Sequence, residues 1–166
     1  MVNTKNVKKM EIPNSILSIL KRNHWDEFNF KLMEQTYLDK LEKYYSKYDY
    51  PMTDTLLKRM ALFYNMKLRF ETGSEKILYF DAKKINKYRQ AFLNSQAEKF
   101  KVKKVVYLGD IHPGYITIWI DENEKIWGDY DNIIYLYGSN LFDGVENILK
   151  NRFDKKSCSV FFPNTG

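Results

Sequence analysis

The alternation of apolar and polar positions is clearest in residues 105–138, where it predicts three or four short strands. Ile116, Ile118 and Ile120 are separated by Thr117 and Trp119, which is the period of a strand with one buried face. The polar residues 121–124 predict a tight turn before a return strand. A β-branched and aromatic run at residues 133–137 predicts a further strand. We therefore expect residues 105–138 to form the core of a sheet on which the earlier elements pack.

Three helices are predicted before this sheet. The first begins near Ser15, with Asn14 or Ser15 as its cap, and ends near Trp25, which we expect to be a packing anchor. The second has apolar residues at spacings of three and four from Met33 to residue 45, and ends before Pro51. The third starts at the cap Thr53 and ends near residue 65. Residues 28–30 fit either a strand or a loop.

Strands and helices alternate in the remaining chain. Residues 66–71 and 77–81 predict a hairpin around Gly73, and residues 82–99 predict one amphipathic helix. Either Ser139 or Asp143 starts a last helix that ends near residue 152. We expect residues 1–166 to form a single domain, with residues 1–11 as a loose lead-in. Residues 153–166, with the apolar cluster at 160–162, predict a C-terminal tail or an edge strand.

Charge is distributed unevenly along this basic chain, whose formal charge is +6 and whose pI is about 9.2. The segment Lys83–Lys104 holds eight basic residues and one acid, whereas Asp110–Asp131 holds six acids and one lysine. Either the protein has two faces of opposite sign, or the two segments neutralise each other where they meet. With Tyr79, Tyr88 and Phe92, the basic segment could bind nucleic acid through phosphates and stacking. The helical spacing of these aromatic residues favours instead a solvated helix face with the rings in the core.

Cysteine content and hydropathy bear on location. The one cysteine, Cys158, excludes an internal disulfide framework and a cysteine-based zinc site, and fits a reducing compartment. The N-terminal residues include lysines but no apolar segment typical of a signal peptide. No apolar run approaches the length of a membrane span. We therefore expect a cytoplasmic protein that does not enter a membrane.

Motifs that would identify an enzyme are weak. Asp110 and His112, with Asp129 or Asp131, could form an acid–base or metal cluster, but a surface turn explains His112 more simply. The acids after residue 120 lack the glycine of a calcium-binding loop. Five glycines fall singly, where we expect turns: Gly109, Gly114, Gly128, Gly138 and Gly144. We expect no enzyme, no metal and no cofactor, while a small hydrolase centred on Asp110 and His112 stays a third interpretation.

Several local phrases between residues 13 and 150 resemble the SUKH superfamily, in particular its bacterial immunity proteins. These phrases are SILSILKRNHW, YPMTDTLLKRMALFYN, the strand ending in Tyr79-Phe-Asp81, VVYLGDI, ITIWIDENEKIWGDY and YGSNLFDGVENILK. Two places depart from the family pattern: His24-Trp25 replaces Gly-Trp, and residues 63–65 replace Phe-Gly-Gly. The resemblance implies an α+β fold with a single central, mostly antiparallel sheet and helices packed around it. It also implies a non-enzymatic protein that binds and neutralises a cognate polymorphic toxin.

The expected partner is therefore a protein toxin, and basic nucleic-acid binding through Lys83–Lys104 is the alternative. Exposed tyrosine and tryptophan side chains are typical of protein–protein hot spots. Many bacterial toxins are nucleases with basic grooves, in which an acidic patch would mimic phosphate. We predict that the toxin contacts the acidic hairpin side through Tyr115, Trp119, Asp121, Glu122, Trp127, Asp129 and Tyr130.

Overall fold

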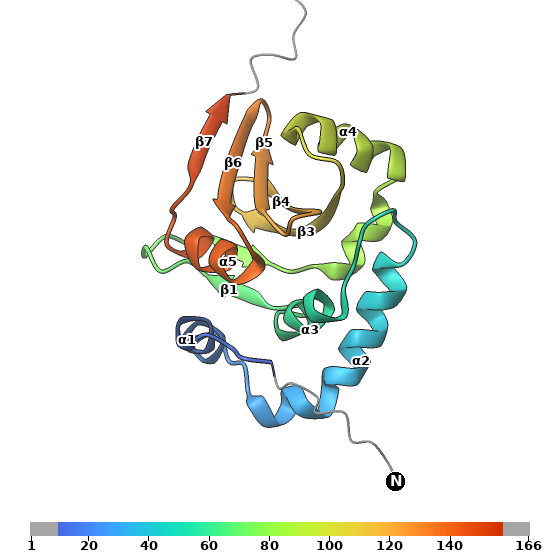
Figure 1. Ribbon diagram of the computed structural model, residues 1–166. Helices are drawn as coiled ribbons and strands as arrows, with labels where there is room; N and C mark the ends of the chain where they lie inside the picture. The colour runs from blue at the N-terminus through green and yellow to red at the C-terminus, as the bar shows by residue number, and fades with distance from the viewer. Residues whose placement is uncertain (1–9, 158–166) are drawn as a thin grey trace, which may run out of the picture.

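The computed structural model describes residues 10–157 and contains one seven-stranded antiparallel sheet with helices around it (Figure 1). This architecture confirms the expected α+β class. The strands follow one another in chain order from β1 to β7, and each pairs with the next. The elements are α1 Asn14–Arg22, α2 Glu27–Tyr45, α3 Asp54–Leu62, β1 Lys67–Arg69, β2 Ile77–Tyr79, the 3-10 helix η1 Ala82–Lys87, α4 Gln90–Phe100, β3 Val105–His112, β4 Ile116–Asp121, β5 Ile126–Tyr130, β6 Ile133–Gly138, α5 Leu141–Leu149 and β7 Asp154–Ser157.

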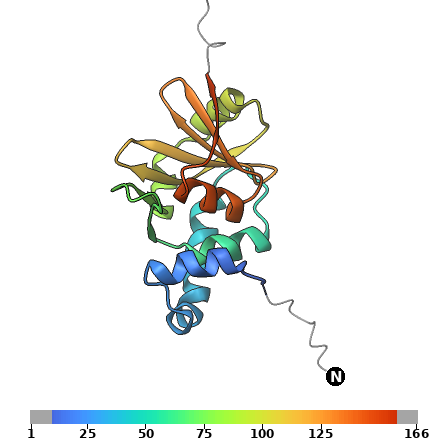
Figure 2. The ribbon, with the colours of Figure 1, turned by 90° about the vertical axis from the view of Figure 1, so that its left-hand side faces the viewer.

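The two faces of the sheet are covered by different helices. In the register of β4 and β5, Trp119 lies opposite Trp127, and the Trp127 ring stacks on Phe100 of α4 at 5.4 Å between centroids. The opposite face carries Ile120 and Ile126, and α5 packs there through Gly144. Figure 2 shows α5 in front of the lower part of the sheet and α4 behind it.

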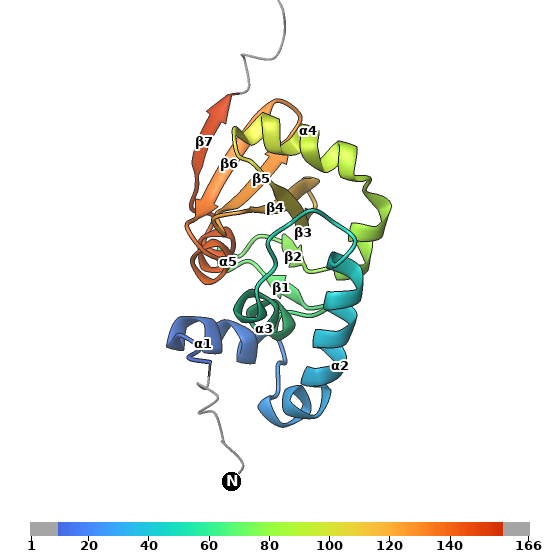
Figure 3. The ribbon, with the colours of Figure 1, turned by 45° about the vertical axis from the view of Figure 1, so that its right-hand side comes forward.

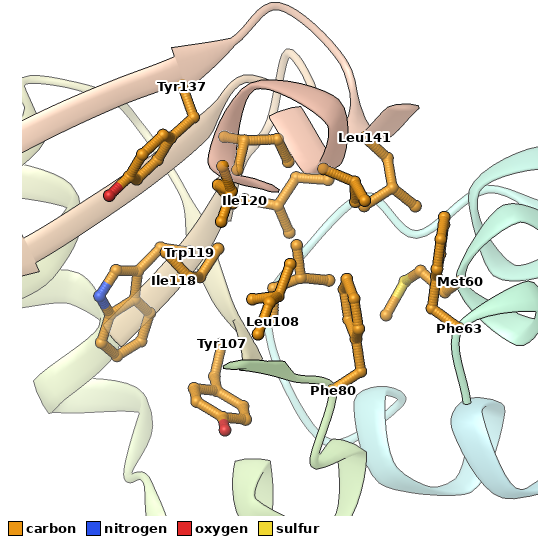
Figure 4. Close-up of a cluster of buried hydrophobic side chains, with 14 of the residues drawn as sticks. Met60, Phe63, Phe80, Tyr107, Leu108, Ile118, Trp119, Ile120, Tyr137 and Leu141 are labelled. Atoms are coloured by element: carbon orange, nitrogen blue, oxygen red, sulfur yellow. The ribbon is translucent and has the colours of Figure 1, made fainter. Parts of the chain in front are cut away.

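The main core lies between the α5 face of the sheet and the helices below it. Ile118 and Ile120 of β4 point toward α3 and α5, while Trp119 points to the other side (Figure 4). Phe63, at the end of α3, stacks on Phe80 and meets Phe142 of α5 edge-on. The period-2 pattern therefore reports two buried faces, each with its own helical cover.

Helix starts agree with the sequence in some places and differ in others. Thr53 caps α3 as predicted, because its side chain accepts from the Leu56 N–H at 3.1 Å. Residues 28–30 belong to α2, which Asp26 caps. The predicted caps of the first and last helices are wrong: α1 has Pro13 at its N-cap with no side-chain cap bond, and Asn140 caps α5.

The single helix expected over residues 82–99 is also wrong. The chain forms η1, becomes extended at Tyr88 and Arg89, and then starts α4. The Tyr48 hydroxyl lies 2.6 Å from the Ile85 carbonyl oxygen and 2.9 Å from that of Tyr88, so it donates into the break. Figure 3 shows the chain bending there beside the upper end of α2.

The end of the described chain adds β7 beside β6, with Tyr135 opposite Lys155 and Leu136 opposite Asp154. Cys158 and the apolar cluster at residues 160–162 lie outside the described residues, as does most of the predicted lead-in. No helix within residues 10–157 combines the length and apolar character needed to cross a bilayer.

Candidate functional site

Asp121, predicted to contact a partner, is a structural residue of the β4–β5 turn. Its side chain is 0% exposed. One carboxylate oxygen accepts from the N–H groups of Asn123 and Lys125 at 2.8 and 2.9 Å, and the other accepts from Trp127 Nε1 at 2.9 Å. Both carboxylate oxygens are therefore occupied by hydrogen bonds that close the turn. A partner cannot reach them unless the hairpin unfolds.

Glu122 and Asp129 are similarly engaged. The N–H groups of Lys103 and Lys104 donate to the two Glu122 carboxylate oxygens at 3.1 and 3.0 Å. Burial alone would raise the pKa of Glu122, but the N–H groups of Lys104, of Glu122 itself and of Lys103 outweigh it and lower that pKa. Asp129 accepts from Trp119 Nε1 at 2.7 Å and pairs with Lys99 at 2.9 Å.

The basic and acidic segments consequently meet and neutralise part of each other's charge, as one of the two arrangements expected from the sequence requires. Lys84 pairs with Asp110 at 2.7 Å, in addition to the pair between Lys99 and Asp129. Three of the acids that were to mimic phosphate thus bond to groups of this chain. The acidic hairpin is not an open anionic patch.

The two tryptophans of the predicted site are buried, with Trp119 1% and Trp127 7% exposed. Trp119 meets Tyr88 edge-on at 5.3 Å between ring centroids, and Trp127 stacks on Phe100. Both rings lie under η1 and α4 and hold that cover to the sheet. In this fold neither ring is exposed to a partner, and the two tryptophans lie opposite each other on neighbouring strands.

The proposed pairing of Asp110 with His112 is not formed. Asp110 is buried and accepts from the Tyr107 hydroxyl at 2.5 Å and from Lys84. His112 is exposed and lies edge-on to the Tyr115 ring, and no hydrogen bond in the described chain joins it to Asp110. Residues 10–157 also contain no cluster of three His, Cys, Asp or Glu side chains placed to hold a metal.

Tyr115 and Tyr130 are the two predicted residues that stand clear of the core, 75% and 49% exposed. They lie at neighbouring strand ends, because β4 starts after Tyr115 and β5 ends at Tyr130. By the register of β5 and β6, Tyr130 shares a face with Tyr135, opposite the α4 side. The sheet thus brings these two tyrosines to one end of the molecule.

A cluster of aromatic side chains continues from Tyr130 across β6 to β7. Tyr135 and Tyr137 stack at 6.0 Å between centroids, and Phe153, 40% exposed, meets both edge-on. Gly128 makes room for this cluster, since a Cβ there would lie 2.7 Å from the Tyr137 ring and 2.9 Å from Ile116. We call the surface formed by Ile116, Tyr130, Tyr135 and Phe153, with the buried ring of Tyr137 beneath them, the aromatic face.

No helix covers the aromatic face in the described chain, because α5 reaches only the lower part of the sheet (Figure 2). Sequence reasoning assigned Tyr130 to a surface but missed Tyr135 and Phe153. A signal was present: Tyr135 and Tyr137 alternate within a strand, and Gly128 supplies a position without a side chain on the neighbouring strand. The position of Phe153 depends on the strand β7, and the sequence of β7 has no apolar pattern from which a strand could be predicted.

A concave surface lies where the α1–α2 loop meets α2 and the end of α3. The pocket measures about 430 Å³ and is lined by rings that include Trp25, Phe30, Tyr37 and Tyr64. Its polar lining carries both signs of charge, from Asp26 and Lys67. The pocket therefore indicates no single class of ligand. Trp25 is an anchor as expected, since it packs on Phe30 at 5.6 Å.

The basic segment retains cations at the surface. Lys83, Lys87, Arg89, Lys101 and Lys103 are exposed, and none forms an ion pair with a described acid. Phe92 of α4 is partly exposed, but its ring stacks on Tyr88 at 5.5 Å. The expectation that the aromatic residues of this segment pack inward holds for Tyr88 and is met only in part by Phe92.

Comparisons with known proteins identify no relative: no family model, no curated protein and no solved structure matches this chain.

Proposed function

We propose that this protein is an immunity protein that binds a cognate polymorphic toxin directly and neutralises it in the cell that makes the toxin. The aromatic face is the observation that carries the proposal. Exposed aromatic rings on a rigid sheet are suited to protein recognition, because they bury much apolar area at a small cost in side-chain entropy. The resemblance of residues 13–150 to the SUKH immunity proteins supports the choice of a toxin as the partner.

The aromatic face replaces the acidic hairpin as the proposed contact surface. Of the residues predicted first, Tyr130 belongs to this face, where Tyr135 and Phe153 join it, and Tyr115 lies beside it at the start of β4. Glu122 lies at the other end of the hairpin, where its carboxylate is held by the N–H groups of Lys103 and Lys104. Apolar burial and ring packing, rather than phosphate mimicry, would then supply most of the binding energy.

The test is alanine substitution on two separate surfaces, and its partner is the toxin that the proposal expects to be encoded beside this gene. Tyr130→Ala and Phe153→Ala should each weaken binding by about tenfold or more, since central aromatic residues cost about 2 kcal/mol when removed. Phe28→Ala is the matched control, because Phe28 is an exposed ring on α2, at the other end of the molecule. Affinity and survival of toxin-expressing cells are the readouts. Unchanged affinity for both sheet variants would refute this surface.

Nucleic-acid binding through Lys83–Lys104 is the second candidate, favoured by the five exposed cations that pair with no described acid. A protein that neutralises phosphates shows an affinity that falls steeply with salt. A labelled random oligonucleotide at low salt should then be retained, and the triple variant Lys83→Glu, Lys87→Glu and Arg89→Glu should release it. If the unmodified protein retains no oligonucleotide at low salt, this candidate is removed.

A further inference from the structure

The two edge strands of the sheet, β1 and β7, differ in whether their outer backbone groups have hydrogen-bond partners in the described chain. At the β1 edge, the Arg69 N–H donates to the Asn23 side-chain oxygen at 3.0 Å, so the end of α1 satisfies part of that edge. β7 is the last strand of the sheet, and within residues 10–157 no other strand pairs with its outer side. Figure 1 shows no helix alongside it. The outer backbone groups of such a strand form a template for one more strand.

The side chains of β7 select what can pair there. Lys155 and Lys156 are exposed, lie opposite Tyr135 and Ile134, and therefore point to opposite faces of the sheet. Neither forms an ion pair with a described acid. If a second copy added its own β7 antiparallel in the register that places Lys155 opposite Lys156, lysines would face lysines at both positions, and like charges directly opposite are unfavourable. An acidic strand would instead place carboxylates beside both ammonium groups.

We propose that the outer edge of β7 binds an acidic, extended segment of a protein partner by strand addition. Backbone hydrogen bonds would provide the pairing, and the two lysines would provide the preference for acids. Lys155 lies on the same face of the sheet as Tyr135. The ring of Tyr135 meets that of Phe153 with 5.0 Å between the ring centroids. The edge is thus continuous with the aromatic face, and the best segment has two adjacent acids and, two positions beyond the acid opposite Lys155, an apolar residue near Phe153. Only the identity of the partner rests on the proposed function.

The probe is a capped eight-residue peptide of valine and threonine with a central pair of glutamates, added to the full-length protein. A matched peptide carries a central pair of lysines. Backbone amide chemical shifts report the site and the affinity together. We expect the acidic peptide to shift the amides of residues 154–157 and to bind at least about tenfold more tightly than the basic one at low salt.

One protein variant and one modified peptide separate the possible causes. In the double variant Lys155→Glu and Lys156→Glu the preference should invert, so that the basic peptide binds and the acidic one does not. Both side chains are exposed, and the far-ultraviolet circular dichroism should stay unchanged. An acidic peptide N-methylated at its central residues should lose binding, because it has lost the donors that strand addition needs. Retained binding of that peptide would show charge attraction alone and overturn the proposal.

Other results would also decide against it. A concentration-dependent dimer in light scattering would make a second copy the occupant, and equal binding of the two peptides would remove the role of the lysines. The proposed function is tested independently by Tyr130→Ala, because Tyr130 lies on β5 and takes no part in strand addition at β7. If the toxin is neutralised while no peptide binds β7, this inference fails and the proposed function stands. If the acidic peptide binds and no toxin does, the reverse holds.

Discussion

At the scale of single residues, Asp121 shows how much one carboxylate contributes to the β4–β5 turn. Asp121→Ala would leave the N–H groups of Asn123, Lys125 and Trp127 Nε1 without their acceptor. An unsatisfied buried polar group costs roughly 1–3 kcal/mol, so we expect the free energy of unfolding to fall by about 3 kcal/mol. Urea unfolding followed by tryptophan fluorescence measures the loss.

Glu98→Ala is the control for Asp121→Ala, because Glu98 is exposed on α4 and a surface change of this kind stays within about 0.5 kcal/mol. Full stability in Asp121→Ala, together with weaker partner binding, would show instead that Asp121 is a contact residue. The sequence could not decide between these roles. It predicted the turn, whereas the tryptophan indole and the two N–H groups become the partners of Asp121 only after the hairpin closes.

Glycine is another residue whose role depended on the surrounding structure. Gly109, Gly128 and Gly138 lie within strands and Gly144 within α5, so of the five glycines expected at turns only Gly114 is in one. Gly114 has φ +119°, which side chains rarely adopt. Gly109, Gly128, Gly138 and Gly144 are required because another segment of the same chain lies too close to leave room for a Cβ atom. Spacing along the sequence gives the place of a glycine but not what packs against it.

At the scale of elements, Gly144 fixes how closely α5 approaches the sheet. A Cβ on Gly144 would collide with the Ile126 side chain, and one on Gly138 would meet the Gly144 backbone. We expect Gly144→Ala to push α5 outward and to lower the free energy of unfolding by about 1–3 kcal/mol, despite the better helix propensity of alanine. Ser18→Ala, exposed on α1, should raise stability slightly. Thermal unfolding of the two variants checks the sign, and a stabilised Gly144→Ala would contradict this packing.

The break between η1 and α4 depends on Tyr48. Tyr48→Phe removes the hydroxyl that lies within hydrogen-bond distance of the Ile85 and Tyr88 carbonyls, and should cost about 1–2 kcal/mol. Hydrogen exchange should quicken at residues 85–92, with Tyr130→Phe on the exposed aromatic face as the unaffected control. Exchange that stays unchanged in Tyr48→Phe would mean that other contacts hold the break.

Elements with a strong internal period were predictable, and elements made by distant contacts were not. α2, α3 and β4 follow from spacing, whereas β3, β5 and β6 follow from apolar runs between turns, since β3 is buried on both faces. The division of residues 82–99 depends on a tyrosine some 35 to 40 positions earlier. β7 has the sequence DKKS, which has no apolar pattern, and it becomes a strand by pairing with β6.

At the scale of the whole molecule, burial changes the acid–base behaviour of the tyrosines. The chain has 13 tyrosines, and burial is the main cause that raises the pKa of eight of them above the usual 10. These eight are Tyr45, Tyr48, Tyr50, Tyr64, Tyr79, Tyr88, Tyr107 and Tyr137. For Tyr88 the pKa is raised to about 12. Folding therefore keeps protons that the unfolded chain releases in alkaline solution.

The sign of the resulting pH dependence follows directly. Below about pH 10 both states hold the phenolic protons and stability is unaffected, whereas above it the unfolded chain ionises first and stability falls. Each such tyrosine contributes a slope of up to about 1.4 kcal/mol per pH unit until its folded pKa is reached. The urea midpoint should thus be flat from about pH 7 to about pH 9 and drop steeply beyond about pH 10. Tyr88→Phe should remove the release of about one proton on unfolding and so make the fall of stability with pH shallower. Tyr115→Phe, at a ring 75% exposed, should leave that slope unchanged. Equal slopes in these two variants would show that ionisation of buried tyrosines does not drive the alkaline unfolding.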